Sequence, residues 1–359
     1  MSTPLRPTRR VALATGLGTL ALMATGCSER GRFFAVPGAA AAHHFSGQTM
    51  GSSYNVKLAG TGLHDTLLRV AEQAVSAALQ ATVAGMSHYE PGSELSRFNR
   101  HPVGEAFAAS HPLLQVLQTA QSVHRASGGS FDVTVGAAVD AWGFGPSRQP
   151  RQPLPAEAQQ TLRAQARPQA LQVDAQARSI IRQAAVFTDL SGIAKGWGVD
   201  QAAEALDTLG IGHYMVEVGG EIRTRGLNAQ GQAWQLAVEK PDAMPQQAYF
   251  VVPLSGQSLA TSGDYRNFYL HEGRRYTHEI DPATAAPVHH TLASVSVVAS
   301  DCTLADAWST ALFVAGPERG LAMARQQGLA AYFVVRQGDG RFGTHATPAF
   351  AALGGRSVG

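Results

Sequence analysis

The chain has few cysteines and few charged side chains. Of its 359 residues only Cys27 and Cys302 are cysteine, and 15% are charged. Because a disulfide framework needs several cysteine pairs, this count excludes a disulfide-stapled scaffold. Hydrophobic residues make up 45% of the chain, which is enough to bury one large core or two moderate ones. The composition therefore predicts a globular protein.

The chain also lacks an apolar run that could cross a bilayer, which takes about 20 residues. The run at residues 11–23 is shorter and is interrupted by Gly16 and Gly18. It follows several arginines with no acidic residue, a pattern typical of an export signal. We expect this signal to cover residues 1–26 and the protein to be exported to the periplasm.

Two motifs refine the expected signal. Thr8-Arg9-Arg10 resembles a twin-arginine export signal, and the stretch from Ala24 to Cys27 resembles a bacterial lipobox. The second motif predicts that Cys27 is lipidated and anchors the protein to the membrane; the alternative is a plain cleaved signal with an incidental cysteine. Residues 27–47, rich in Gly, Ala and His, are expected to form a flexible tether.

A basic surface is missing as well. The whole chain has 28 basic and 26 acidic side chains, and three of the arginines lie in residues 1–26, so the mature chain has a net charge of about −1. Without a basic block, a nucleic-acid partner is excluded. The Gly-x-Ser-x-Gly and His-Glu-x-x-His motifs are absent, and the histidine pairs lack further ligands, which argues against hydrolases of those kinds and against zinc or iron.

The order of expected elements favours an α+β fold, with mixed and antiparallel sheets flanked by helices. Periodicity predicts a strand at 54–58, helices over 67–79 and 113–126, and a polar helix over 154–175. The middle third holds strand-like segments that should form an antiparallel sheet, at 214–218, 221–225, 234–238, 249–252 and 258–261. A strand at 293–298 and helical spacing from Leu304 to Val314 follow. We expect a catalytic domain over 48–345 and a C-terminal tail over 346–359.

The stretch from Asp189 to Asp200 places three glycines and Lys195 at the start of an expected helix, after an apolar run ending at Leu190 that suits a strand. Glycines let backbone N–H groups approach an anion at the positive end of the helix dipole, so the loop could cradle a phosphate. The alternative is a tight turn in which Asp189 or Ser191 caps the helix and Lys195 points to solvent.

Asp306 and Thr310 lie four residues apart on a predicted helix, so that both oxygens face the same way. Such oxygen ligands suit Mg²⁺, which keeps several waters and needs few protein side chains. The alternative is a threonine that bonds back into its own helix.

Three further clusters contain side chains that could bind or react. Phe131 and Trp142, each beside glycines, could stack on a planar ring or fill the core. The segment 86–99 closes the first long helix with polar and turn residues. His278 lies in a strand-like run before an Asp-Pro turn and could act as a general base or simply hydrogen-bond its neighbours.

Taken together, nine segments resemble the ApbE family, the FAD:protein FMN transferases. They are residues 49–54, 93–99, 129–134, 142–146, 189–196, 218–220, 260–263, 278–282 and 305–307. The resemblance covers about residues 48–345. It implies a cleft for FAD and Mg²⁺ and a reaction that moves FMN from FAD to a threonine or serine hydroxyl of a partner protein, with release of AMP.

The resemblance also implies roles for individual residues. The positions that match FAD contacts are Met50, Tyr89, Ser130, Phe131, Asp132, Asp189, Lys195 and Ile280. Asp306, Thr310 and the Gly192 carbonyl match the metal site. His278 is the first candidate for general base, with Asp306 second. Lys195 and Ser309 differ from some members, which leaves open a further metal or acidic ligand.

The expected partner is a flavoprotein subunit of a membrane redox complex, with nitrous oxide reduction as one candidate pathway. Two other functions stay open on the same scaffold. One is an FAD pyrophosphatase, in which water replaces the protein hydroxyl. The other is a redox protein that keeps its FAD intact.

Overall fold

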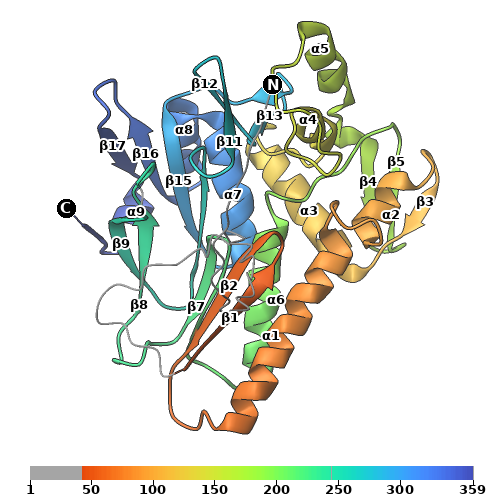
Figure 1. The fold of residues 1–359 in the computed structure, drawn as a ribbon. Helices are drawn as coiled ribbons and strands as arrows, with labels where there is room; N and C mark the ends of the chain where they lie inside the picture. The colour runs from red at the N-terminus through yellow and green to blue at the C-terminus, as the bar shows by residue number, and fades with distance from the viewer. Residues whose placement is uncertain (1–42, 244, 359) are drawn as a thin grey trace, which may run out of the picture. The chain divides into compact units, whose positions relative to one another are not determined.

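An antiparallel sheet of eight strands organises the part of the chain that the structure, a computed structural model, describes: residues 43–243 and 245–358. In spatial order, the strands are β1 (His43–Thr49), β2 (Ser52–Leu58), β6 (Tyr214–Val218), β7 (Glu221–Arg225), β10 (Ser258–Gly263), β15 (Leu292–Ala299), β16 (Ala330–Arg336) and β17 (Phe342–Ala346). Helices and smaller sheets pack around it (Figure 1). The predicted α+β class is confirmed.

The sheet is buried on both faces at its centre. Seven of the eight residues of β15 are buried, which explains its nearly continuous apolar sequence. Val295 and Val297 point into a core shared with the helices, whereas Val298 points into a second core beneath a small sheet. Since successive side chains of a strand point to opposite faces, β15 connects these two cores.

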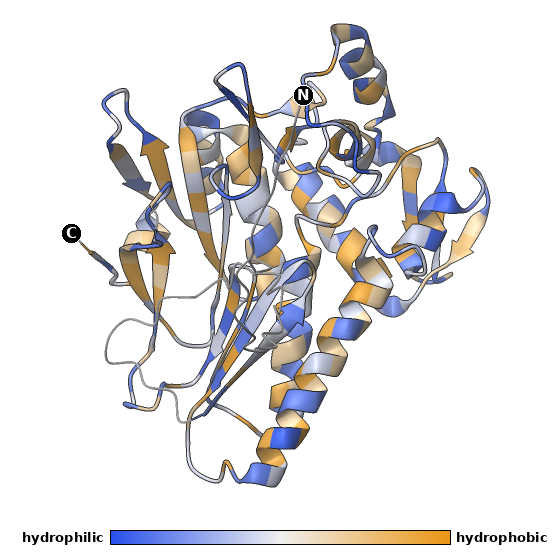
Figure 2. Ribbon diagram, in the orientation of Figure 1, coloured by the Kyte–Doolittle hydropathy of each residue, from blue (hydrophilic) through white to orange (hydrophobic). Residues whose placement is uncertain are grey.

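Three long helices, α1, α6 and α7, lie on one side of this sheet, where α6 packs against both α1 and α7 (Figure 1). The helices of the described residues are α1 (Asp65–Met86), α2 (Glu94–Arg100), α3 (His111–Ala126), α4 (Gly136–Ala141), α5 (Ala156–Gln165), α6 (Ala194–Thr208), α7 (Cys302–Ala315), α8 (Pro317–Gln326) and α9 (Pro348–Ala351). Figure 2 shows hydrophobic and hydrophilic residues alternating around α1, as a half-exposed helix requires. None of these helices has the length and apolar character to cross a membrane.

Short strands complete the fold. One small sheet has the order β18 (Arg356–Ser357), β9 (Ala248–Leu254), β8 (Trp234–Glu239); another has β3 (Ala106–Ala108), β5 (Ser179–Arg182), β4 (Leu171–Asp174). Two hairpins stand apart, β11 (Phe268–His271) with β12 (Arg274–Thr277) and β13 (Ile280–Asp281) with β14 (Ala286–Pro287). The strands β8 and β9 therefore do not join the sheet of the other middle-third strands, contrary to the single sheet expected.

Several expected boundaries need correction. The helix predicted over 154–175 ends at Gln165, because a 3-10 turn at Pro168 leads into β4, which pairs with β5. The strand expected to end at Leu190 ends at Arg182; beyond it only Phe187 forms an isolated bridge. These boundaries depend on which strands pair with each other, and the local periodicity of the sequence does not contain that information.

The two ends of the described chain are also more regular than expected. The strand β1 begins at His43, inside the tether predicted over 27–47, because it pairs along its length with β2. The predicted tail, 346–359, contains α9 and β18, and Phe350 is buried in the core beneath the small sheet. The export signal, Cys27 and the tether up to residue 42 lie outside the described residues.

The starts of α6 and α7 touch at Gly196. A Cβ added at this glycine would overlap the Cys302 carbonyl oxygen and lie 2.8 Å from the Cβ of Asp306. We therefore expect Gly196→Ala to lower the free energy of unfolding by about 3 kcal/mol, the upper end of the range for overpacked sites. Thermal or denaturant unfolding measures the change. The control is Gly85→Ala in α1, where nothing lies within 4 Å of the added Cβ and a gain of about 0.5 kcal/mol is expected. Equal stability of the two variants would contradict the close helix contact.

Candidate functional site

A cavity of about 930 Å³ lies where the β1–β2 turn, the start of α6, one side of α7, the start of β7 and the end of β10 converge. All twelve residues that the family resemblance matched to FAD contacts, to the metal site or to the general base line it. These are Met50, Tyr89, Ser130, Phe131, Asp132, Asp189, Gly192, Lys195, His278, Ile280, Asp306 and Thr310. The structure thus brings all of them to one place, while the role of each stays a prediction.

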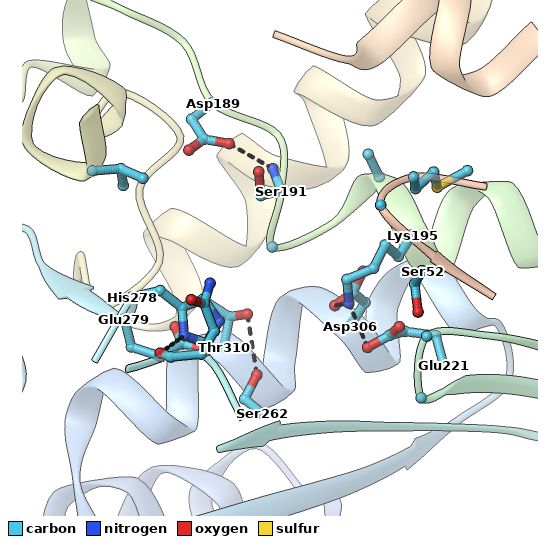
Figure 3. Close-up of a pocket in the computed structure, with 18 of the residues that line it drawn as sticks. Ser52, Asp189, Ser191, Lys195, Glu221, Ser262, His278, Glu279, Asp306 and Thr310 are labelled. Atoms are coloured by element: carbon cyan, nitrogen blue, oxygen red, sulfur yellow. Dashed lines mark hydrogen bonds and ion pairs between the residues drawn. The ribbon is translucent and has the colours of Figure 1, made fainter. Parts of the chain in front are cut away.

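Lys195 in the first turn of α6 lies between two buried carboxylates (Figure 3). Its Nζ is 2.5 Å from Glu221 Oε1 and 3.8 Å from Asp306 Oδ1. Burial alone would lower the pKa of Lys195, but Asp306 and Glu221 raise it above its usual value. Burial raises the pKa of Glu221 to about 7, although Lys195 opposes the rise. The lysine is therefore a fixed cation of the cavity wall, and the alternative that it points to solvent is wrong.

Side-chain contacts hold the loop before α6 in place, and none of them is a helix cap. Asp189 Oδ1 accepts a hydrogen bond from the Ser191 N–H at 2.7 Å, and the helix begins after Ile193 with no side-chain cap. Asp189 also pairs with His88 Nδ1 at 3.2 Å. Burial alone would raise the pKa of Asp189, but His88 and Ser191 lower it, so the carboxylate is ionised. The tight-turn alternative required Asp189 or Ser191 to cap α6, and neither residue does so.

A further set of oxygen atoms lies beside α7, on the side of the helix that lines the cavity. Asp306 Oδ2 accepts the Gly196 N–H at 2.9 Å, and Thr310 lies one turn further along the same helix. A Cβ added at Gly192 would lie 3.0 Å from Thr310 Oγ1, so any larger residue would crowd this hydroxyl. Ser262 Oγ lies 3.3 Å from Thr310 Oγ1. A carboxylate, a hydroxyl and a nearby backbone carbonyl are the donor types that Mg²⁺ prefers.

This donor set fits magnesium in chemistry but contains few acidic side chains. Within residues 43–243 and 245–358, no group of three or more His, Cys, Asp and Glu side chains is arranged to hold a metal ion. A magnesium ion here would therefore depend on Asp306, the Thr310 hydroxyl, the Gly192 carbonyl and the substrate. Burial raises the pKa of Asp306, while Lys195 opposes the rise.

Aromatic side chains from two loops reach the cavity. Phe131 is only 3% exposed and lines the wall, whereas Tyr89 is 51% exposed and donates its hydroxyl hydrogen to the Phe144 carbonyl at 2.6 Å. Trp142 instead donates to the Ala285 carbonyl at 2.8 Å and packs in the core with Tyr276. Of the two stacking candidates, Phe131 therefore lines the cavity and Trp142 does not.

Polar groups on either side of Phe131 are held in place. Asp132 Oδ1 accepts from both the N–H and the hydroxyl of Thr134, at 2.8 and 2.7 Å. Burial raises the pKa of Asp132, and these hydrogen bonds oppose the rise. The Ser130 hydroxyl accepts from Arg319 at 2.9 Å. This loop is therefore rigid before any ligand binds.

Two apolar residues complete the predicted set. Met50 adopts a positive φ of 49° in the β1–β2 turn. Its Cε packs closely against Gly198, since a Cβ added at that glycine would lie only 2.6 Å from it. Ile280 is 5% exposed and joins the small core around Trp142. Both shape the cavity wall through packing.

His278 follows β12 and lies at the cavity wall. Its Nδ1 is 3.1 Å from the Asn267 carbonyl oxygen, and its side chain is 37% exposed. Partial burial, together with the nearby Lys195 cation, lowers the pKa of His278 to about 4, although the hydrogen bond with the Asn267 carbonyl opposes the fall. The imidazole is therefore neutral at pH 7 and can accept a proton.

Sequence reasoning missed several residues that line the cavity. They are His88, Glu221, Ser262, Arg266 and Glu279. All but Arg266 lie next to or within a segment that the sequence had already marked, such as the Gly-Gly pair before Glu221. The strand Glu221–Arg225 is mostly polar, so no pattern in the sequence marks Glu221 as a buried carboxylate that needs a partner.

Comparisons with known proteins identify relatives of this chain. The sequence model of the ApbE family matches residues 50–333. The FAD:protein FMN transferase of Haemophilus influenzae is 40% identical over 314 residues, 86% of this chain and 90% of that protein. The one from Escherichia coli K12 is 34% identical over 313 residues, 86% and 88% of the two chains.

Solved structures show the same likeness. The flavin transferase ApbE from Vibrio cholerae superposes with a TM-score of 0.79 at 38% identity, covering 87% of this chain and 98% of that one. The apo flavinyl transferase ApbE of Pseudomonas stutzeri gives a TM-score of 0.79 at 36% identity, covering 87% and 96%.

Proposed function

This chain belongs to the ApbE family and is an FAD:protein FMN transferase; from this premise we propose that it uses Mg²⁺ to move FMN from FAD to a threonine or serine hydroxyl of a flavoprotein, releasing AMP. One observation carries the proposal. All twelve residues chosen from the sequence line a single cavity, with a fixed cation, oxygen ligands and a neutral imidazole around it.

The cavity has a place for each part of the substrate. Glycine-rich backbone at the start of α6 and the Lys195 cation suit the pyrophosphate of FAD, because both favour negative charge. Phe131 and the exposed ring of Tyr89 offer apolar faces for the planar ring systems. Asp306, Thr310 and the Gly192 carbonyl would hold Mg²⁺, which when bound neutralises charge on the transferring phosphate.

The reaction then needs one proton transfer and one displacement. The acceptor hydroxyl oxygen attacks the phosphorus on the flavin side, forming a new P–O bond as the bond to the AMP phosphate oxygen breaks. His278 Nε2 takes the hydroxyl proton, and AMP leaves with the bonding electron pair. Lys195 reduces the repulsion between the incoming oxygen and the charged phosphate.

A mixture of the purified protein with FAD and Mg²⁺ tests the proposal, with and without a threonine-bearing acceptor. Flavin fluorescence that stays with the denatured acceptor supports transfer. Free FMN formed without an acceptor supports the FAD pyrophosphatase, and an intensely yellow protein with intact FAD and no need for metal supports the redox protein. The cluster of Lys195, Asp306 and Thr310 favours transfer or hydrolysis, since a resting flavin needs no magnesium at its pyrophosphate.

The proposal extends to the protein's surroundings. The sequence of residues 1–27 supports an exported, periplasmic protein anchored to the membrane by a lipidated Cys27. We therefore propose that the acceptor is a flavoprotein subunit of a membrane redox complex, with nitrous oxide reduction as one candidate pathway. A pull-down followed by mass spectrometry for FMN-modified peptides identifies the acceptor.

A further inference from the structure

The orientation of the His278 ring leaves one nitrogen facing the cavity. A carbonyl oxygen can only accept a hydrogen bond, so the contact of Nδ1 with the Asn267 carbonyl at 3.1 Å assigns the ring hydrogen to Nδ1. Nε2 is then the atom that accepts a proton. The same backbone carbonyl also accepts the His278 N–H at 3.2 Å, which holds the residue in place.

A buried carboxyl lies beside this nitrogen. Glu279 Oε1 is 3.7 Å from His278 Nε2, and the Glu279 side chain is 10% exposed. Glu279 lines the same cavity and lies close to His278 in Figure 3. The nearby Ser262 hydroxyl lowers the pKa of this carboxyl and so favours its ionised form. The function proposed above gives this residue no task.

We propose that Glu279 is a positioning residue that acts through His278, with its carboxylate stabilising the imidazolium formed when Nε2 takes the proton of the acceptor hydroxyl. The proposal rests on the transfer reaction proposed above. Opposite charges 3.7 Å apart attract each other, and the Glu279 end of the pair is shielded from water. An imidazole that is otherwise a weak base thereby becomes strong enough to take the proton as the new P–O bond forms.

The surroundings of Glu279 set the pH at which it can act. Burial raises the pKa of Glu279 to about 8; Lys195 opposes the rise, whereas Asp306 and Asp189 add to it. The carboxyl is therefore mostly protonated at pH 7 and mostly ionised above pH 8. Because the ionised form is the one that stabilises the imidazolium, the transfer rate should rise as pH increases from 7 to 9.

The test uses Glu279→Gln, which keeps the size and hydrogen-bonding capacity of the side chain but removes its charge. We expect kcat for FMN transfer to fall about 10- to 100-fold, the KM for FAD to change less than twofold, and the rise between pH 7 and 9 to disappear. Glu279→Asp should restore part of the rate. In a His278→Ala background, adding Glu279→Gln should change the rate less than twofold, because the residue through which it acts is gone. Glu272→Gln, on an exposed turn of the neighbouring hairpin, is the matched control.

Two outcomes would overturn the proposal: an unchanged rate and pH profile in Glu279→Gln, or the same loss with and without His278. A loss of FAD binding in Glu279→Gln would also count against it, since the carboxyl would then hold the substrate. Failure of the proposed function looks different, because the wild-type protein would then leave no FMN on the acceptor at any pH.

Discussion

His278→Ala is expected to transfer FMN about 10² to 10⁴ times more slowly than the wild type, the range typical of losing a general base. FAD should still bind, because Phe131, Lys195 and the backbone before α6 line the cavity independently of the imidazole. Single-turnover transfer to an acceptor protein gives the rate, and flavin fluorescence quenching gives the dissociation constant. The control is His271→Ala at the end of β11, a residue that does not line the cavity.

The pH dependence adds a second measurement to this variant. Burial lowers the pKa of His278 to about 4, so the imidazole is neutral and able to accept a proton throughout the range above pH 5. Protonation of Nε2 should therefore add a separate fall in wild-type transfer only as pH drops toward 4, well below the change between pH 7 and 9 that Glu279 sets. Full transfer activity in His278→Ala would remove this residue from the reaction and leave Asp306 as the candidate base.

Asp306→Asn is expected to lower transfer by about 10² to 10³ and to remove most of its dependence on Mg²⁺, because the neutral amide is a poor ligand for that ion. The amide oxygen can still accept the Gly196 N–H, so the contact between α6 and α7 is kept. Transfer rates over a range of Mg²⁺ concentrations, with a chelator as the zero point, measure the effect.

Thr310 provides a matched pair for the same idea. Thr310→Val removes the hydroxyl at nearly constant size and should weaken the response to Mg²⁺, whereas Thr310→Ser keeps the oxygen and should stay close to the wild type. Unfolding measurements on all three variants separate a fold defect from a metal defect. If Asp306→Asn keeps both the rate and the Mg²⁺ response of the wild type, the magnesium site lies elsewhere.

The parts of the site that the sequence predicted share a local origin. Asp306 and Thr310 are four residues apart, and helical spacing alone places them on one face of α7. The glycines around the start of α6 likewise indicate that the backbone there comes close to another group. The family resemblance supplied the remaining positions, including Met50, which has no chemical signature of its own.

The parts that the sequence could not predict depend on contacts across the chain. Glu221 reaches Lys195 only because β7 begins beside the start of α6, and no local sequence pattern predicts that contact. His88 was passed over because its segment looked like a capped loop, yet it holds Asp189 from a hundred residues away. The prediction of a strand up to Leu190 was wrong for the same reason. Its last apolar side chains pack in the core, but their backbone is irregular.

The backbone contact between Gly196 and Cys302 has a consequence for how ligands bind. It joins the helix that presents Lys195 to the helix that presents Asp306 and Thr310, and the Gly196 N–H bond to Asp306 adds to the joint. Lys195 and the oxygen atoms of Asp306 and Thr310 are therefore held at a fixed separation by the fold itself. Most of the conformational entropy of assembling them is lost when the chain folds, so the free energy of ligand binding is not spent on ordering them.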